Sequence, residues 1–129
     1  MQNHPRTGTE HQIAFTVDAA RTIHFREAGL PPVLATPWLI WQLETACMEL
    51  LQGYLGENEI SLGTAVDVEH LAPARLGAHV DVHARVIRAD GRDILFQVEA
   101  SSTGTLLSKG QHRRRVVAID RLRARLESM

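Results

Sequence analysis

Residues 36–55 read TPWLIWQLETACMELLQGYL, and this stretch decides the fold. Thr36 followed by Pro37 is typical of a helix start, because threonine caps free N–H groups and proline suits the first turn. From Trp38 to about Leu55 the apolar residues recur at helical spacing, and nearby glycines mark the expected end. The recurring apolar residues are Leu39, Leu43, Ala46, Cys47, Leu50, Leu51 and Tyr54.

Outside this helix the chain alternates between apolar and polar residues with the period of a strand. Turn sequences at Asp90-Gly91 and at residues 102–105 join successive strands closely, so these strands are antiparallel. An antiparallel sheet with one long helix on its face is an α+β domain, and a sheet wrapped around one central helix is the hotdog fold. The expected strands span residues 12–18, 62–70, 80–86, 94–100 and 106–119, with a short terminal helix over 121–127.

The chain has 129 residues, which fits one domain over 1–129, and the polar residues 1–10 are expected to be frayed. A formal net charge of -1 argues against a nucleic-acid partner. The apolar runs are too short for a membrane span, and the N-terminus lacks the apolar core of a signal peptide. Cys47 is the single cysteine, which fits a reducing cytoplasm. We therefore expect a cytoplasmic protein with no nucleic-acid and no membrane partner.

Glu44 breaks the pattern of the helix. It lies roughly 120° from the centre of the polar face that Gln42, Thr45, Glu49 and Gln52 define. Its helical neighbours are apolar, so the carboxylate is expected to feel desolvation. Two interpretations stay open at this point: a boundary glutamate whose tip reaches water, or a carboxylate kept for chemistry.

His70 and Gly63 break the pattern of the strand over residues 62–70. Thr64, Val66, Val68 and His70 share one face, so the valines and His70 are expected to point toward the core. Such a histidine is either a hydrogen-bonded structural group or a proton carrier, and Thr36 is either a helix cap or a functional hydroxyl. Gly63 indicates either a β-bulge or close approach of a ligand to its N–H group.

The remaining polar residues predict no metal site. His79 and His83 share a strand face but lie roughly 13 Å apart, too far to bind one metal ion. The run Arg113-Arg114-Arg115 alternates between the two faces of its strand. It is typical of a solvated edge, although two of its members could meet phosphate groups.

Two segments together resemble the fluoroacetyl-CoA thioesterase branch of the hotdog superfamily. One runs from Ala35-Thr36-Pro37-Trp38 to Glu44-Thr45-Ala46-Cys47, and the other is residues 61–72; a later Gly110-x-His112-x-Arg114 is similar to the final strand of that branch. The resemblance covers residues 10–125. Its most specific part is the order and spacing of Thr36, Glu44, Gly63 and His70.

The resemblance implies a catalytic set of Thr36, Glu44 and His70, with the Gly63 N–H group near the thioester carbonyl. It implies an active site between two subunits, hence a homodimer, possibly assembled further into a tetramer. His112 and Arg114 match positions on the CoA-facing side. The substrate would be an acyl-CoA, with CoA as part of the substrate and no other cofactor.

One position departs from that branch. Its fluoroacetyl-specialised members resemble one another in aromatic lid residues before the threonine, whereas this chain has Leu30 within Gly29-Leu30-Pro31-Pro32. The departure puts the fluoroacetyl substrate in doubt but not the thioester chemistry.

The sequence therefore predicts an acyl-CoA thioesterase acting on a small or medium acyl group. Glu44 is expected to act either as nucleophile or as general base toward water. Two alternatives stay open: a non-catalytic acyl-CoA sensor with the same fold, and an acyl-CoA lyase or dehydratase. Release of free thiol from acyl-CoA substrates distinguishes a hydrolase from both.

Overall fold

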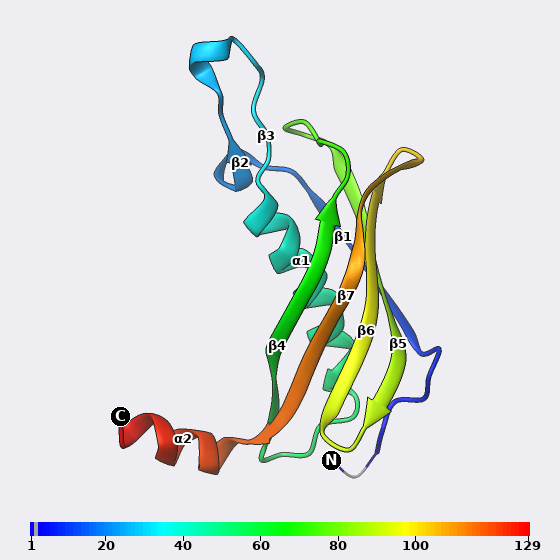
Figure 1. The fold of residues 1–129 in the computed structure, drawn as a ribbon, viewed down its shortest axis with the longest axis vertical. Coiled ribbons are helices and arrows are strands. Elements are labelled where there is room, and N and C mark those ends of the chain that lie inside the picture. The colour runs from blue at the N-terminus through cyan, green and yellow to red at the C-terminus, as the bar shows by residue number, and fades with distance from the viewer. Residues whose placement is uncertain (2) are drawn as a thin grey trace.

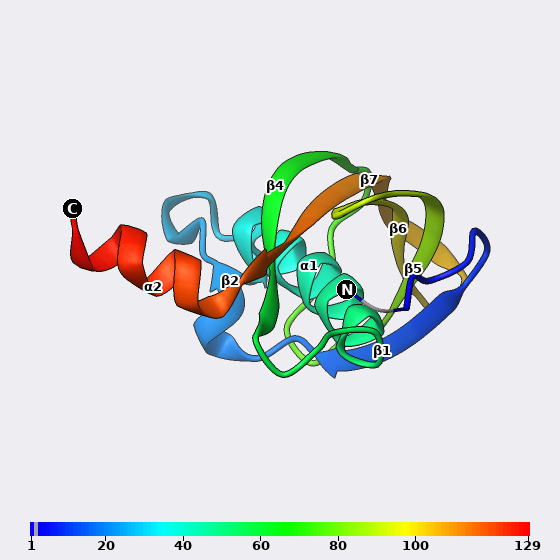
Figure 2. The same ribbon diagram turned by 90° about the horizontal axis from the view of Figure 1, so that it is seen from below.

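The structure is a computed structural model that describes residue 1 and residues 3–129. Five antiparallel strands form one sheet in the order β1-β5-β6-β7-β4. The sheet curves around the long helix α1 (Thr36–Gln52), as Figures 1 and 2 show. This arrangement confirms the α+β hotdog fold. The strands are β1 (Glu10–Thr16), β4 (Glu59–His70), β5 (His79–Asp90), β6 (Asp93–Ser102) and β7 (Thr105–Ala118).

Helix α1 packs its apolar stripe against the inner face of the sheet. The six predicted core residues within the helix are all buried, and they meet inward side chains of β5 and β6 such as Val82 and Phe96. Burying one such side chain contributes about 1.5–3 kcal/mol, so this stripe fixes the position of the helix. The buried residues of α1 are Leu39, Leu43, Ala46, Cys47, Leu50 and Leu51.

The ends of α1 differ from the prediction. Ala35, not Thr36, occupies the N-cap position, and Thr36 belongs to the first helical turn. The Thr36 hydroxyl is bonded to His70 instead of to the helix backbone, which explains why it makes no cap. The helix stops at Gln52 rather than near Leu55, and Gly53 forms the C-cap.

Two tight turns set the order of the central strands. Gly91 has φ 60° in the β5–β6 turn, and Thr103 and Gly104 have φ 46° and 79° in the β6–β7 turn. Positive φ at both central residues of the β6–β7 turn, and at the first central residue of the β5–β6 turn, matches the right-handed twist of the flanking strands. The predicted turns are confirmed, and β4 is left at the edge of the sheet with β7 as its one neighbour in it.

Part of the segment that the sequence predicts to be frayed, residues 1–10, makes backbone hydrogen bonds to β5. Gly8 N–H donates to the Val86 carbonyl at 2.7 Å, and Val86 N–H donates to the Thr9 carbonyl at 2.9 Å. Gln2 lies outside the described residues.

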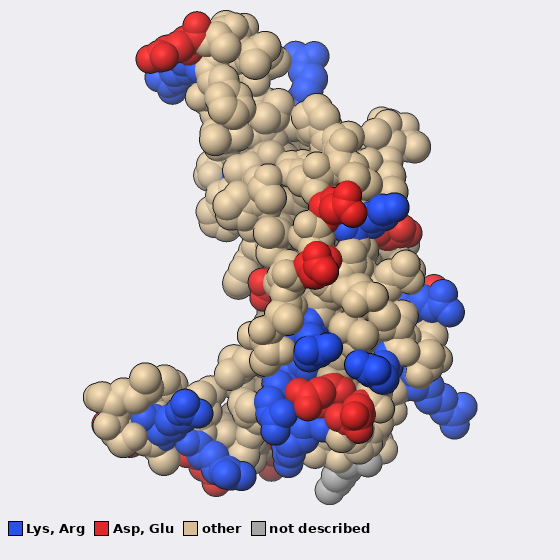
Figure 3. All heavy atoms as spheres, viewed as in Figure 1, with Lys and Arg blue, Asp and Glu red and all other residues tan. Residues whose placement is uncertain are grey.

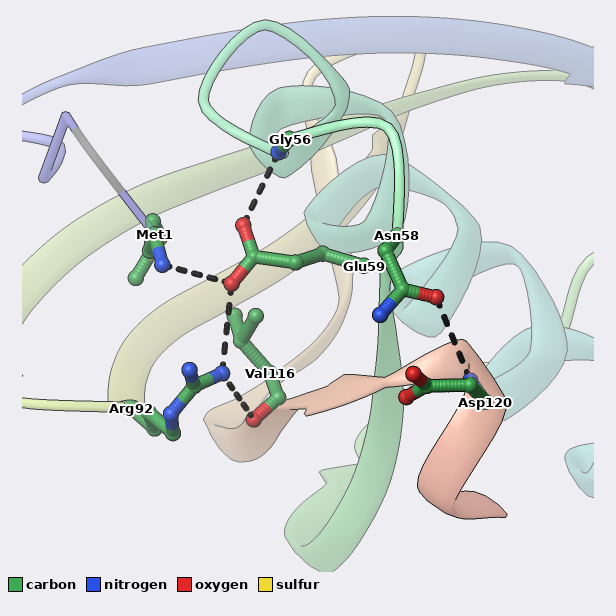
Figure 4. A network of polar contacts seen from close by, with 7 residues as sticks. All are labelled: Met1, Gly56, Asn58, Glu59, Arg92, Val116 and Asp120. Atoms are coloured by element: carbon green, nitrogen blue, oxygen red, sulfur yellow. Dashed lines mark hydrogen bonds and ion pairs between the residues drawn. The ribbon is translucent and has the colours of Figure 1, made fainter. Parts of the chain in front are cut away.

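Glu59 joins three segments at the end of the sheet, as Figure 4 shows. Its carboxylate accepts hydrogen bonds from the Met1 ammonium at 2.5 Å, from Gly56 N–H at 2.8 Å and from Arg92 at 3.2 Å. These donors hold the pKa of Glu59 below its usual value, with the Met1 ammonium as the largest cause. The network ties the chain start and the β5–β6 turn to the start of β4.

Several short elements were not predicted. The 3-10 helices at Ala19–Arg21 and Arg26–Ala28 and the paired strands β2 (Thr22–Ile23) and β3 (Val33–Leu34) form an extension before α1. This extension projects past the end of the sheet in Figure 1. Two-residue strands give too little alternation to be recognised from sequence.

Helix α2 (Ile119–Glu127) follows β7 and leads away from the body of the molecule in Figures 1 and 2. The predicted terminal helix is confirmed, and it begins two residues earlier than expected. None of its residues is buried. Neither described α-helix has the length and apolar content that crossing a membrane requires.

Candidate active site

Glu44 points from α1 toward β4 and β7. Its Oε2 lies 3.5 Å from Arg114 Nη1, and its side chain is 31% exposed. A Cβ atom added to Gly63 would lie 3.0 Å from the same oxygen. The carboxylate is therefore a half-buried group held between a buried cation and a strand backbone, and not a solvated boundary residue.

Gly63 combines the two interpretations that the sequence left open. The pairing of β4 with β7 shifts register between Gly63 and Ala65, which marks a bulge. An added Cβ would also come within 3.1 Å of His112 Cε1 and 3.4 Å of Arg114 Nη1. Only glycine fits at this position without displacing a neighbour, because three functional side chains crowd the same point.

Arg114 is buried on the inner face of β7, so the interpretation of the arginine run as a solvated edge is wrong for this member. Its Nε donates to Ser61 Oγ at 2.9 Å, and its Nη2 donates to the Ser61 carbonyl at 2.8 Å. Burial lowers the pKa of Arg114, and the Glu44 carboxylate opposes this. The guanidinium remains charged, since its usual pKa lies far above neutral pH.

His112 is also buried and has a defined tautomer. Its Nδ1 lies 2.9 Å from the Ala65 carbonyl, which only accepts, so Nδ1 carries the proton. Its Nε2 then accepts from Arg114 Nη1 at 3.1 Å. Burial is the main cause that lowers the pKa of His112, and the Arg114 charge adds to it. The imidazole is therefore neutral near pH 7.

Cys47 lies on the buried stripe of α1, as predicted. Burial is the main cause that raises the pKa of its thiol far above the usual value, and Glu44 adds to it. A thiol in that state is a poor nucleophile.

Thr36 and His70 form a second cluster at the N-terminal end of α1. Thr36 Oγ1 lies 2.8 Å from His70 Nδ1. The imidazole Nε2 is buried and has no hydrogen-bond partner among the described residues. His70 and Val66 lie on the inner face of β4, as predicted, because they pair with the buried residues Ser108 and His112 of β7. Val66 is nevertheless 41% exposed, since β4 is at the edge of the sheet.

The Thr36–His70 pair borders an open hollow of about 460 Å³. The hollow lies between the β2–β3 extension and the segment after β4, and its lining is mostly apolar. Leu30, at the expected lid position, is 53% exposed and lies outside this lining. The apolar lining includes Ile23, Phe25, Val33, Leu71 and Pro73.

The predicted site residues therefore form two groups within one chain. Thr36 contacts His70, while Glu44 gathers with Gly63, His112 and Arg114. Eight residues along a helix correspond to about 12 Å, so Thr36 and Glu44 lie too far apart for direct contact. The catalytic trio suggested by the resemblance is not one contact group in a single chain.

Sequence reasoning missed several residues that shape these groups. Ser61 anchors Arg114, and the Ala65 carbonyl fixes His112. Phe25 reaches the hollow from a segment with no regular pattern. Backbone acceptors carry no sequence signal, but the buried position of Ser61 on the inner face of β4 could have been inferred from strand alternation.

No group of three or more His, Cys, Asp or Glu side chains gathers as for a metal ion within residues 1 and 3–129. That the reaction needs neither metal nor cofactor stays a prediction.

The curved sheet, the central helix and the carboxylate at Gly63 define a thioesterase of the hotdog fold. A thioesterase superfamily member from Thermus thermophilus superimposes with a TM-score of 0.89 at 29% identity, covering 99% of this chain and 94% of the other. A hot-dog-like protein from Thermanaerovibrio acidaminovorans gives a TM-score of 0.86 at 26% identity, covering 95% and 90%. The fluoroacetyl-CoA thioesterase FlK gives 0.89 at 28% identity, covering 98% of each chain.

The sequence profile of the fluoroacetyl-CoA-specific thioesterase family matches residues 17–120, and the chain belongs to this family. The fluoroacetyl-CoA thioesterase of Streptantibioticus cattleyicolor is 32% identical over 99 residues, which are 77% of this chain and 71% of that protein. The chain is accordingly a thioester hydrolase, as its resemblance implied.

Proposed function

We propose that this enzyme hydrolyses a small or medium acyl-CoA to the free acid and CoA, at a site shared by two copies of the chain. The observation that carries the proposal is the Glu44 carboxylate, placed by Arg114 beside the backbone of Gly63. Gly63 has no side chain, so a thioester carbonyl can approach its backbone. The Gly63 N–H group can then hold the carbonyl oxygen while the adjacent Glu44 carboxylate acts on the carbonyl carbon.

Two routes are open to Glu44. In the first, a carboxylate oxygen attacks the thioester carbon, the C–S bond breaks, and water hydrolyses the resulting anhydride. In the second, the carboxylate takes a proton from a water molecule that attacks the same carbon. In both routes the carbonyl oxygen gains negative charge, which the Gly63 N–H group would stabilise.

His70 and Thr36 supply the proton chemistry in this proposal. The bond from Thr36 Oγ1 to Nδ1 orients the imidazole. Its Nε2 makes no hydrogen bond to any described residue and is available to protonate the departing thiolate. The apolar hollow beside this pair suits a small or medium acyl chain.

A second copy of the chain would bring the two groups together. Thr36, which contacts His70, lies about 12 Å from Glu44 along α1, so each group needs its counterpart from elsewhere. Large apolar side chains near them are exposed, among them Trp38 at 40% and Trp41 at 53%. β4 also presents an unpaired edge, with Leu62 39% exposed. A two-fold related copy covering this surface supports a homodimer, and a tetramer of two such dimers stays open.

A cytoplasmic location is part of the proposal. Cys47, the single cysteine, is a free buried thiol, which suits a reducing compartment.

Glu44→Gln tests the proposal against the alternative of an acyl-CoA sensor. We expect kcat for thiol release to fall by about 10²-fold or more, because an amide is neither base nor nucleophile. Calorimetry should show binding of a non-hydrolysable acyl-CoA analogue within about tenfold of the parent chain. Glu49→Gln on the same helix is the matched control, since Glu49 is exposed and pairs with His11. Full activity of Glu44→Gln would reject the proposed role of Glu44.

A further inference from the structure

Four arginines line a groove where β7 meets α2. The groove has a volume of about 420 Å³, and Arg92, Arg115, Arg121 and Arg125 contribute to it from the β5–β6 turn, β7 and α2. Figure 3 shows Lys and Arg side chains gathered at this end of the sheet and along α2. The whole chain carries a net charge of -1, so this is a local concentration of positive charge.

The four arginines differ in their partners. Arg92 pairs with Glu59 at 3.2 Å and Arg115 with Asp93 at 3.0 Å, so these two are partly neutralised and held in place. Arg121 and Arg125 have no carboxylate partner among the described residues. Unpaired guanidinium groups on a concave surface favour a phosphate ligand, which they can bind with two parallel hydrogen bonds.

The groove also offers apolar surface. Val117 and Leu122 are half-buried and form part of its lining between the arginines. Cationic side chains around an apolar floor suit a ligand that joins phosphates to a flat base.

The groove lies within reach of the candidate active site along β7. Arg114 pairs with Gly63, and Ala118, which lines the groove, is four residues further along the strand. Four strand residues span about 13 Å, a distance that an extended pantetheine arm can bridge.

We propose that this groove binds the 3′-phospho-ADP part of CoA, with Arg121 and Arg125 as its phosphate ligands. The inference rests on the proposed function, because it assigns the nucleotide end of the same substrate.

Single variants Arg121→Ala and Arg125→Ala test the assignment in the full chain. Each should raise KM for acetyl-CoA by about five- to tenfold with kcat unchanged, because a charged hydrogen bond to substrate is lost outside the reacting centre. The rise should shrink at high salt. Arg123→Ala is the matched control: it changes the same charge on the same helix but does not line the groove, so its KM should stay within about twofold.

S-Acetyl-N-acetylcysteamine is a thioester without a nucleotide. Its hydrolysis distinguishes failure of the proposed nucleotide site from failure of the proposed hydrolase function. Its hydrolysis should be equal in all four proteins. Unchanged KM for acetyl-CoA, or an equal rise in KM for both thioesters, would overturn the nucleotide site while leaving the hydrolase intact. Failure of the parent chain to hydrolyse any acyl-CoA or this truncated thioester would reject the proposed function instead.

Discussion

Gly63 is the β4 residue whose missing side chain leaves room for the Glu44 carboxylate. Gly63→Ala would place a methyl group 3.0 Å from Glu44 Oε2 and 3.1 Å from His112 Cε1. We expect kcat to fall by at least about tenfold, because displacement of the carboxylate misaligns it with the carbonyl, and stability to fall by about 1–3 kcal/mol.

Gly53→Ala is the control for that substitution. Gly53 has φ -70° and no atom within 4 Å of an added Cβ. Its kcat and urea midpoint should match those of the parent chain. Equal kcat for Gly63→Ala and the parent would show that the close approach at Gly63 has no catalytic role.

His112 makes stability depend on pH below neutrality. Its pKa in the folded chain lies below the usual 6.5. As the pH falls below about 6.5, the unfolded chain binds a proton at His112 before the folded chain does. The contribution of neutral His112 to stability is therefore fully present above about pH 6.5 and is lost on acidification. Thermal unfolding from pH 7.5 to 5 should show a fall in Tm that is shallower in His112→Gln. An equal slope in the variant would assign the acid sensitivity to other groups.

Among the elements, the extension before α1 is the one that we expect to influence substrate preference, because it borders the hollow beside Thr36 and His70. Leu30, at the position where the resemblance implies an aromatic lid, lies outside the lining of the hollow. We therefore expect kcat/KM for fluoroacetyl-CoA and acetyl-CoA to differ by less than about 200-fold, since one altered apolar contact is worth about 1–3 kcal/mol, or about 10–200-fold. A preference of several orders of magnitude would show that other residues, such as Phe25, do the work of the lid.

The elements that could be predicted from the sequence are those with long periodic signals. The stripe of α1 and the alternation of β5 to β7 extend over many residues, and both were found within a few residues of their ends. Thr36 misled the prediction of the helix cap because its hydroxyl bonds to His70, a residue 34 positions away. The solvated-edge interpretation of residues 113–115 fails for Arg114 because its anchor, Ser61, lies on a different strand. Local patterns cannot show such long-range partners.

At the scale of the whole molecule, the separation of Glu44 from His70 supports the proposal of a site completed by a second copy. Glu44→Gln and His70→Ala homodimers should both be inactive. Mixing them after reversible unfolding should restore about a quarter of the parent activity, because half of the dimers become mixed and each carries one intact site. Absence of recovery, with mixed dimers verified by mass spectrometry, would place Glu44 and His70 in the same subunit's site.

The buried thiol of Cys47 should not contribute to the signal in an assay of thiol release. Cys47 is the single cysteine and has no exposed surface. Thiol reagents react with the thiolate, and burial keeps this group protonated. Ellman's reagent will therefore count released CoA without counting the native protein. A stoichiometric colour change in the absence of substrate would report opening of the core, so one reagent follows both turnover and integrity.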